Sequence, residues 1–149
     1  MLKQIAEELL ARPDLKAAYM PLDYEELLNL EQNPVDFLSS LGDKEERTTI
    51  RTYLGSMRYT ADEMSHAIRE LSGGQKAKLL FLKMSLDGCN VLILDEPTRN
   101  FSPLSGPVIR QVLKEYPGAI ISISHDRKYL EEVVDTTYEL TEQGLVKRN

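Results

Sequence analysis

The sequence predicts an α/β fold built on a parallel sheet, and three features support this prediction. The runs Val91-Leu92-Ile93-Leu94 and Ala119–Ile123 have the length and apolar character of buried strands. Between them lies an amphipathic segment that begins near Pro107 and is broken by Pro117-Gly118. A strand, a crossover helix and a second strand form a βαβ unit, so the two strands are expected to be parallel and covered on both faces.

Composition narrows the class of protein. The chain has 149 residues, a net charge of −6, 42% hydrophobic and 28% charged residues, which is typical of one globular domain. The single Cys89 cannot form an intrachain disulfide. No apolar run reaches the roughly 18 residues of a membrane span, and the acidic start lacks a signal peptide's apolar region. We expect a cytoplasmic protein with no membrane span and no dominant phosphate-neutralising surface.

The first elements alternate between helix and strand. Leu2, Ile5 and Leu9 fall on one face of a helix over residues 2–10. Residues 15–20 are expected to form a strand that ends at Pro21, because proline has no N–H to donate. A short helix capped by Asp23 and running to residue 30 should follow.

Residues 31–71 are expected to be helical, with no strand. The first of three helices should begin at Asn33-Pro34 and end at Gly42, and the second should run from Asp43 to Gly55. The third should begin at the capping box Thr60-Ala61-Asp62-Glu63 and end near Glu70. The charged run at residues 43–47 is interpreted as a solvated helix face rather than a docking patch.

A glycine-containing turn then opens the next helix. In Leu71-Ser72-Gly73-Gly74-Gln75, Ser72 can cap the helix and Gln75 is its capping-box partner. Gly73 and Gly74 allow a ligand to approach the backbone closely, and free N–H groups at a helix start can bind an anion. A plain turn before an amphipathic helix over residues 76–86 is the alternative for this motif taken alone.

Two polar motifs follow the two predicted strands. Asp95 and Glu96 come after the first strand, where ligands of parallel sheets gather. Asp95 can hold Mg²⁺ through hard oxygen ligands, and Glu96 can polarise an attacking water. His125 ends the second strand, so it should reach a phosphoryl group in the same crevice. A helix over residues 127–134 and a terminal hairpin over 136–147 complete the chain.

Together, in this order, these motifs resemble the nucleotide-binding domain of ATP-binding cassette (ABC) proteins, which has a P-loop NTPase-like fold with a helical subdomain. The segment 71–75 resembles the family's signature motif, residues 91–97 its Walker B strand, and His125 its switch histidine. The resemblance implies that ATP and Mg²⁺ are cofactors, that Asp95 orders the ion, and that Glu96 activates water. It also implies that His125 contacts the γ-phosphate. The resemblance further implies that, in a head-to-tail pair of cassettes, ATP held by the opposite cassette contacts Ser72, Gly73, Gly74 and Gln75.

The end of the chain is similar to the ABC-F branch. Ser124-His125-Asp126-Arg127-Lys128-Tyr129-Leu130 and the segment 137–144 carry this resemblance. It implies two cassettes in one chain without membrane domains, and an ATPase that acts on the ribosome in translation or antibiotic resistance. Three alternatives remain: the ATPase subunit of a transporter, a chromosome-maintenance or repair ATPase, and a non-enzymatic α/β interaction module.

The sequence departs from the family pattern in three places. No phosphate-binding loop of the form G-x-x-x-x-G-K-[ST] occurs, so a cassette truncated at its N-terminus is expected. Leu22 stands where the family has a Mg²⁺-binding glutamine, and Ser102 where an aspartate spans the dimer interface. We therefore expect three parts: residues 1–22, a helical subdomain at 23–71, and residues 72–149. The chain alone should be inactive. The resemblance implies that the strand of the missing loop would lie beside Ala119–Ile123, so this edge should be unpaired and the chain should self-associate through it.

Overall fold

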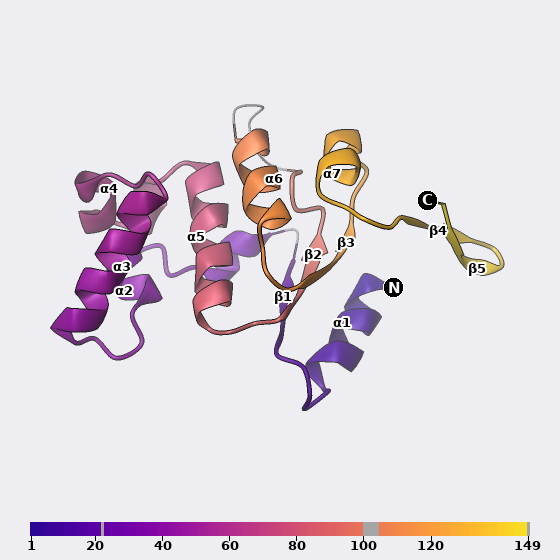
Figure 1. Cartoon of the computed structure of the whole chain (residues 1–149), viewed down its shortest axis with the longest axis horizontal. Helices are drawn as coiled ribbons and strands as arrows, with labels where there is room; N and C mark the ends of the chain where they lie inside the picture. Colours follow the sequence, from indigo (N-terminus) through magenta and orange to yellow (C-terminus); the bar gives the residue numbers. More distant parts are fainter. Residues whose placement is uncertain (22, 100–104, 149) are drawn as a thin grey trace.

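A three-stranded parallel sheet lies at the centre of the computed structural model, which describes residues 1–21, 23–99 and 105–148 (Figure 1). Its strands are β1 (Ala17–Met20), β2 (Val91–Asp95) and β3 (Ala119–Ile123), in the order β1-β2-β3. Ala17 pairs with Val91 at one side of β2, and Val91 pairs with Ala119 at the other. The predicted βαβ unit and the α/β fold class are confirmed.

Both faces of the central strand are covered. On one face, Leu2 and Ala6 of α1 (Leu2–Leu10) pack against Val91 and Ile93. On the other, Leu92 and Leu94 join a larger core with α5 (Gly73–Leu86) and α6 (Gly106–Lys114). This explains why β2 is an uninterrupted apolar run, whereas the edge strand β3 leaves Ile121 37% exposed.

The helices between β1 and α5 are, in chain order, η1 (Tyr24–Leu27), α2 (Pro34–Leu38), α3 (Lys44–Ser56), α4 (Ala61–Ser65) and η2 (Ile68–Glu70). The helices labelled α2, α3 and α4 gather at the end of the molecule opposite the C-terminal hairpin (Figure 1). Of the helices between β1 and α5, η1 and α2 contact α5, which carries the same apolar core to the sheet, while α3 and α4 pack on α2.

Several helix boundaries in this part differ from expectation. Asp23 precedes only a 3₁₀ turn, and its side chain caps nothing there. Gly55 lies inside α3 instead of ending it, because a helix tolerates glycine where tertiary packing supports it. The Thr60 capping box forms as predicted, but α4 ends at Ser65. Short helices of this kind are set by packing rather than by local propensity.

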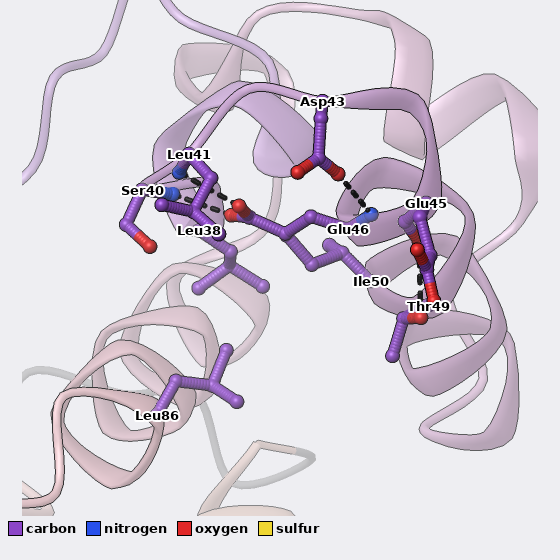
Figure 2. Close-up of a pocket in the computed structure, with 9 residues that line it drawn as sticks. All are labelled: Leu38, Ser40, Leu41, Asp43, Glu45, Glu46, Thr49, Ile50 and Leu86. Carbon is purple, nitrogen blue, oxygen red and sulfur yellow. Dashed lines mark hydrogen bonds between the residues drawn. The ribbon is translucent and has the colours of Figure 1, made fainter.

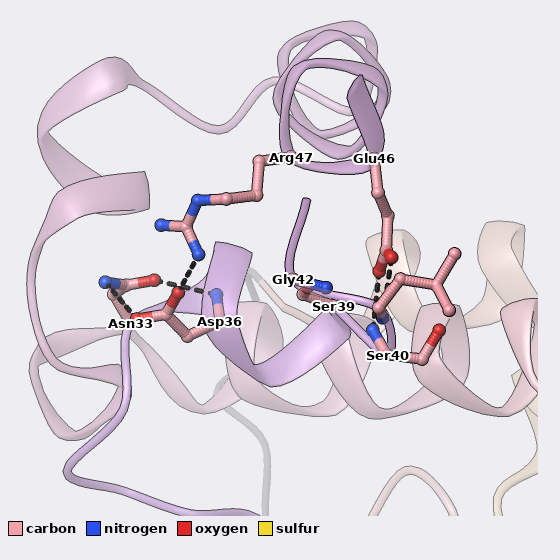
Figure 3. Close-up of polar contacts among 8 residues, drawn as sticks. Asn33, Asp36, Ser39, Ser40, Gly42, Glu46 and Arg47 are labelled. Carbon is pink, nitrogen blue, oxygen red and sulfur yellow. Dashed lines mark hydrogen bonds and ion pairs between the residues drawn. The ribbon is translucent and has the colours of Figure 1, made fainter. Parts of the chain in front are cut away.

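The charged run at residues 43–47 is not simply a solvated face. The Arg47 guanidinium pairs with Asp36 of α2, and the Glu46 carboxylate accepts hydrogen bonds from the backbone of the α2–α3 loop (Figure 3). These partners lie up to eleven residues away in sequence. The charge pattern on α3 therefore serves partly to hold the preceding loop.

The C-terminal part follows prediction. After α7 (Arg127–Glu132), strands β4 (Tyr138–Thr141) and β5 (Gly144–Lys147) form the expected antiparallel hairpin. The hairpin stands away from the body of the molecule (Figure 1). Across the described residues, no helix has the length and apolar character needed to span a membrane.

Gly118 provides a test of the sheet packing. A Cβ at this position would lie 2.6 Å from the backbone oxygen of Asn90, which accepts the N–H of Ala119 at the start of β3. Gly118→Ala should lower the free energy of unfolding by about 1–3 kcal/mol, because backbone must shift. Gly55→Ala is the matched control: only Met64 Cε lies near, at 3.9 Å, so this change should stabilise α3 by about 0.5–1 kcal/mol. Urea denaturation measures both; equal effects would contradict the prediction.

Candidate functional site

The carboxyl ends of β2 and β3 bring Glu96 and His125 together. Asp95 pairs with Ile123 in the sheet register, and the next residue, Glu96, donates its N–H to the Ile123 carbonyl at 2.9 Å. His125 Nε2 lies 3.5 Å from Glu96 Oε1, and the His125 backbone N–H donates to Glu96 Oε2 at 3.4 Å. Two adjacent parallel strands thus place an acid and an imidazole at one crevice.

Glu96 and His125 differ in exposure. The Glu96 side chain is 14% exposed, whereas the His125 side chain is 91% exposed. A sheltered carboxylate can act as a base on a bound water, while an exposed imidazole can meet a ligand arriving from outside. The φ of Glu96 is +48°, in the left-handed region that non-glycine residues rarely adopt and that is enriched at functional sites.

Asp95 is partly buried beside β1. Burial raises the pKa of Tyr19, and the negative charge of Asp95 raises it further. Among the described residues, no group of three or more carboxylate, histidine or cysteine side chains could hold a metal ion. Mg²⁺ commonly uses one or two protein carboxylates and takes its other ligands from phosphates and water. Asp95 therefore fits an ion that arrives with a nucleotide.

Asp126 joins the loops that follow the two strands, a link that the sequence analysis did not predict. Its carboxylate accepts hydrogen bonds from Thr98 Oγ1 at 2.7 Å and from the N–H groups of Lys128 and Tyr129 at 3.0 and 3.3 Å. Asp126 is thus the N-cap of α7. An aspartate one residue before a helical pattern is a recognisable cap signal, but its bond to Thr98 depends on the fold.

The Asp126 contacts predict a pH-dependent stability. The Thr98 hydrogen bond is the largest cause that lowers the pKa of Asp126 below its ordinary value. A carboxyl with a depressed folded pKa stabilises the protein above its unfolded pKa and loses that contribution as the pH falls through the folded value.

Asp126→Ala should therefore lower the free energy of unfolding by about 1 kcal/mol at neutral pH, and the difference from wild type should shrink below about pH 4. Thermal unfolding across pH measures this. Asp126→Asn, which retains a capping oxygen, is the control and should cost less. A pH-independent difference would contradict the assignment.

The Ser72–Gln75 turn forms as predicted at the start of α5. Ser72 N–H donates to Gln75 Oε1 at 3.1 Å, and Gln75 N–H donates to Ser72 Oγ at 3.2 Å, which completes the capping box. Gly73 is exposed, whereas Gly74 is buried where a Cβ would lie 2.8 Å from the Ser105 side chain. The turn therefore presents backbone at the surface while α5 packs closely behind it.

Two tyrosines hold this turn from the helical part. Tyr24 Oη donates to the Gly73 carbonyl at 3.2 Å, and Tyr59 Oη donates to the Gln75 carbonyl at 2.7 Å. Gln75 Nε2 also donates to Glu63 of the α4 capping box. Sequence reasoning missed these contacts, since the tyrosines are 49 and 16 residues away and no local pattern marks them.

The predicted site residues form two groups. Asp95, Glu96 and His125 lie at the carboxyl ends of β2 and β3, and residues 72–75 lie at the start of α5. Among the described residues, no hydrogen bond or ion pair joins Ser72 or Gln75 to Glu96 or His125. Leu22 and Ser102, the two departures from the family pattern, lie outside the described residues.

Comparison with known families decides what these motifs belong to. The sequence model described as ABC transporter matches residues 4–99, which is more than half of the chain and includes the Ser72–Gln75 turn, Asp95 and Glu96. The chain belongs to the ABC transporter family.

A curated relative supports the resemblance to the F branch of this family. ABC transporter F family member 2 of Arabidopsis thaliana is 34% identical over 97 residues, which cover 65% of this chain and 14% of the relative. The chain thus spans only a small part of the length of such relatives.

Solved ABC structures share the fold. A metal-chelate type ABC transporter in an inward-facing conformation matches 98% of this chain and 67% of its own, with a TM-score of 0.72 and 14% identity. A dimeric ATP-binding cassette in a post-hydrolysis state, bound to ADP and phosphate, matches 76% of this chain and 54% of its own, with a TM-score of 0.58 and 18% identity. At these identities the likeness shows the fold alone, and it confirms the P-loop NTPase-like sheet.

Proposed function

We propose that this chain is part of an ABC ATPase cassette. It supplies the water-activating carboxylate Glu96, the switch histidine His125 and the turn at residues 72–75, called the signature turn below. The observation that carries the proposal is the pair Glu96 and His125, which meet at 3.5 Å at the ends of adjacent parallel strands. Glu96 orients and deprotonates the attacking water, and His125 donates a hydrogen bond to the transferred phosphoryl group. Asp95 would hold the Mg²⁺ that accompanies ATP, and the ion would offset the negative charge of the phosphates.

The separation of the two groups of site residues supports a head-to-tail pair of cassettes. Among the described residues, no hydrogen bond or ion pair links Ser72 or Gln75 to Glu96, as expected if this turn serves a nucleotide held by another cassette. Ser72, Gly73, Gly74 and Gln75 would offer hydroxyl, amide and backbone N–H donors to the phosphates. The solved cassette bound to ADP and phosphate is itself a dimer.

The F-branch relative favours an ABC-F type ATPase. As the resemblance to that branch implies, we propose that it acts in the cytoplasm on the ribosome, in translation or antibiotic resistance. The motif from Ser124 to Leu130 agrees with that assignment. Within the cassette, residues 23–71 would act as the helical subdomain between residues 1–22 and 72–149.

The edge of β3 supports self-association of the chain when it is alone. In the described sheet β3 pairs with β2 only, and Ile121 and Ala119 are exposed. An edge strand with free backbone groups can pair with another chain. We expect concentration-dependent association in sedimentation velocity; a monomer at all concentrations would contradict it.

An ATPase measurement tests the proposed function. The chain alone should show no turnover above background, because it has no phosphate-binding loop. Addition of a cassette that carries such a loop should produce hydrolysis, and ATP bearing a photoreactive γ-phosphate should then crosslink to Ser72 or Gly74. Turnover by the chain alone that Glu96→Gln removes would contradict the first expectation. Crosslinking without the second cassette would contradict the head-to-tail arrangement.

A further inference from the structure

A hollow of about 450 Å³ opens in the helical part, outside the proposed nucleotide site (Figure 2). It lies between the loop that joins α2 to α3, the first half of α3 and the last turn of α5. The residues that line it are Leu38, Ser40, Leu41, Asp43, Glu45, Glu46, Thr49, Ile50 and Leu86.

The hollow has an apolar floor and an exposed aliphatic rim. Leu38 and Ile50 are buried at its base, only 3% and 5% exposed. Leu41 and Leu86 stand at its edge with 79% and 51% of their surface in contact with solvent. Aliphatic side chains grouped around a concave surface gain free energy when a partner removes them from water.

The polar lining has one sign of charge. Asp43, Glu45 and Glu46 line the hollow, and in the part of the chain that the structure describes no lysine, arginine or histidine does. The nearest arginine on α3, Arg47, is held by Asp36, and Figure 3 shows it on the other side of the loop from the Glu46 contacts. The hollow therefore repels phosphate groups and attracts cations.

The loop at the rim is already fixed. The Glu46 carboxylate accepts the N–H groups of Ser40 and Leu41, the latter at 2.7 Å, and Ser39 Oγ accepts the N–H of Gly42 at 3.0 Å. Gly42 adopts a φ of +75°, which glycine allows without strain. Burial would raise the pKa of Glu46, but these hydrogen bonds hold it below its ordinary value. A preformed rim reduces the entropy that a partner must lose on binding.

We propose that this hollow docks a helical segment of a partner protein that carries an aliphatic side chain flanked by lysine or arginine. The aliphatic side chain would cover Leu38 and Ile50 between Leu41 and Leu86, and the basic groups would pair with Asp43 and Glu45. This is recognition of an amphipathic helix in a groove, with charge setting specificity. The proposal goes beyond ATP hydrolysis, since it uses none of the residues placed at the nucleotide site.

Three synthetic amphipathic peptides test the proposal. They share one leucine face, and their polar faces consist of lysine, glutamine or glutamate. Fluorescence anisotropy measures the binding of each peptide to the full chain. The lysine peptide should bind most tightly and the glutamate peptide least, and affinity for the lysine peptide should fall with salt. Leu41→Ser and Glu45→Lys should each weaken lysine-peptide binding about tenfold or more. Both residues are exposed, so the fold should persist, and circular dichroism checks this.

Two matched variants serve as controls. Leu145→Ser removes an exposed leucine from the hairpin, and Glu8→Lys makes the same charge change on α1; neither should alter binding. The proposal is overturned if the three peptides bind equally or not at all, or if the controls weaken binding as much as Leu41→Ser. Self-association of the chain that Leu41→Ser abolishes would assign the hollow to a second copy and also overturn it. Glu96→Gln should bind the lysine peptide as wild type does, whether or not ATP hydrolysis is lost once a polypeptide with a phosphate-binding loop completes the cassette, so failure of this proposal and failure of the proposed function are distinguishable.

Discussion

Tyr129→Ala is expected to lower the free energy of unfolding by about 3–5 kcal/mol, the range for removal of a fully buried aromatic ring. Tyr129 is 0% exposed and belongs to the main core with Leu92 and Leu94 of β2. Its Oη donates to Ser122 Oγ of β3 at 3.0 Å, and burial raises its pKa. The ring therefore fixes α7 to the sheet directly behind the loop that carries His125.

Chemical denaturation of wild type and variant measures this effect. Tyr129→Phe is the control, since it keeps the ring and removes one hydrogen bond, and it should cost only about 1 kcal/mol. A loss below that value for Tyr129→Ala would show that the cavity collapses or that the ring is not buried. Exchange of the His125 amide hydrogen should also become faster in Tyr129→Ala, because the loop loses its support.

Glu96→Gln is expected to reduce ATP hydrolysis by at least about 100-fold when a separate polypeptide with a phosphate-binding loop completes this cassette, so that ATP is held beside Glu96. The amide has nearly the same shape as the carboxylate but cannot accept the proton of the attacking water. The backbone contacts of residue 96, including its bond to the Ile123 carbonyl, do not depend on the side chain, so the fold should persist. Steady-state phosphate release measures the rate.

Glu131→Gln on the exposed side of α7 is the matched control and should leave the rate unchanged. Nucleotide binding should survive in Glu96→Gln, because water activation contributes to the transition state rather than to binding. Equal rates for Glu96→Gln and wild type would remove Glu96 from the reaction and would leave Asp95 and His125 as the groups to test.

Local sequence was sufficient for much of the fold. The run of residues 91–94 predicted a buried strand because both faces of β2 are covered, and the run Ala119–Ile123 predicted its parallel neighbour. The capping boxes at Thr60 and Ser72 predicted two helix starts, since each box is completed within four residues. Adjacent strand ends then placed Glu96 near His125, as the structure confirms.

Tertiary structure decided the features that depend on distant partners. Three helices of residues 23–71, η1, α2 and α4, are shorter than their patterns predicted, whereas α3 runs past Gly55 to Ser56, because tertiary packing rather than propensity sets where they end. Tyr24 and Tyr59 hold the signature turn, Asp126 joins Thr98, and Glu46 fixes the loop beside the acidic hollow.

The features that local sequence predicted differ from those that tertiary structure decided for one physical reason. A cap, a turn or a strand period is satisfied by neighbours along the chain, so the sequence alone determined the α/β order and the positions of the motifs. A hydrogen bond such as Tyr24 Oη to the Gly73 carbonyl exists only once the core has brought two segments together. The support of the site, and the surface beside α3 that can take a partner, were therefore decided by the folded structure.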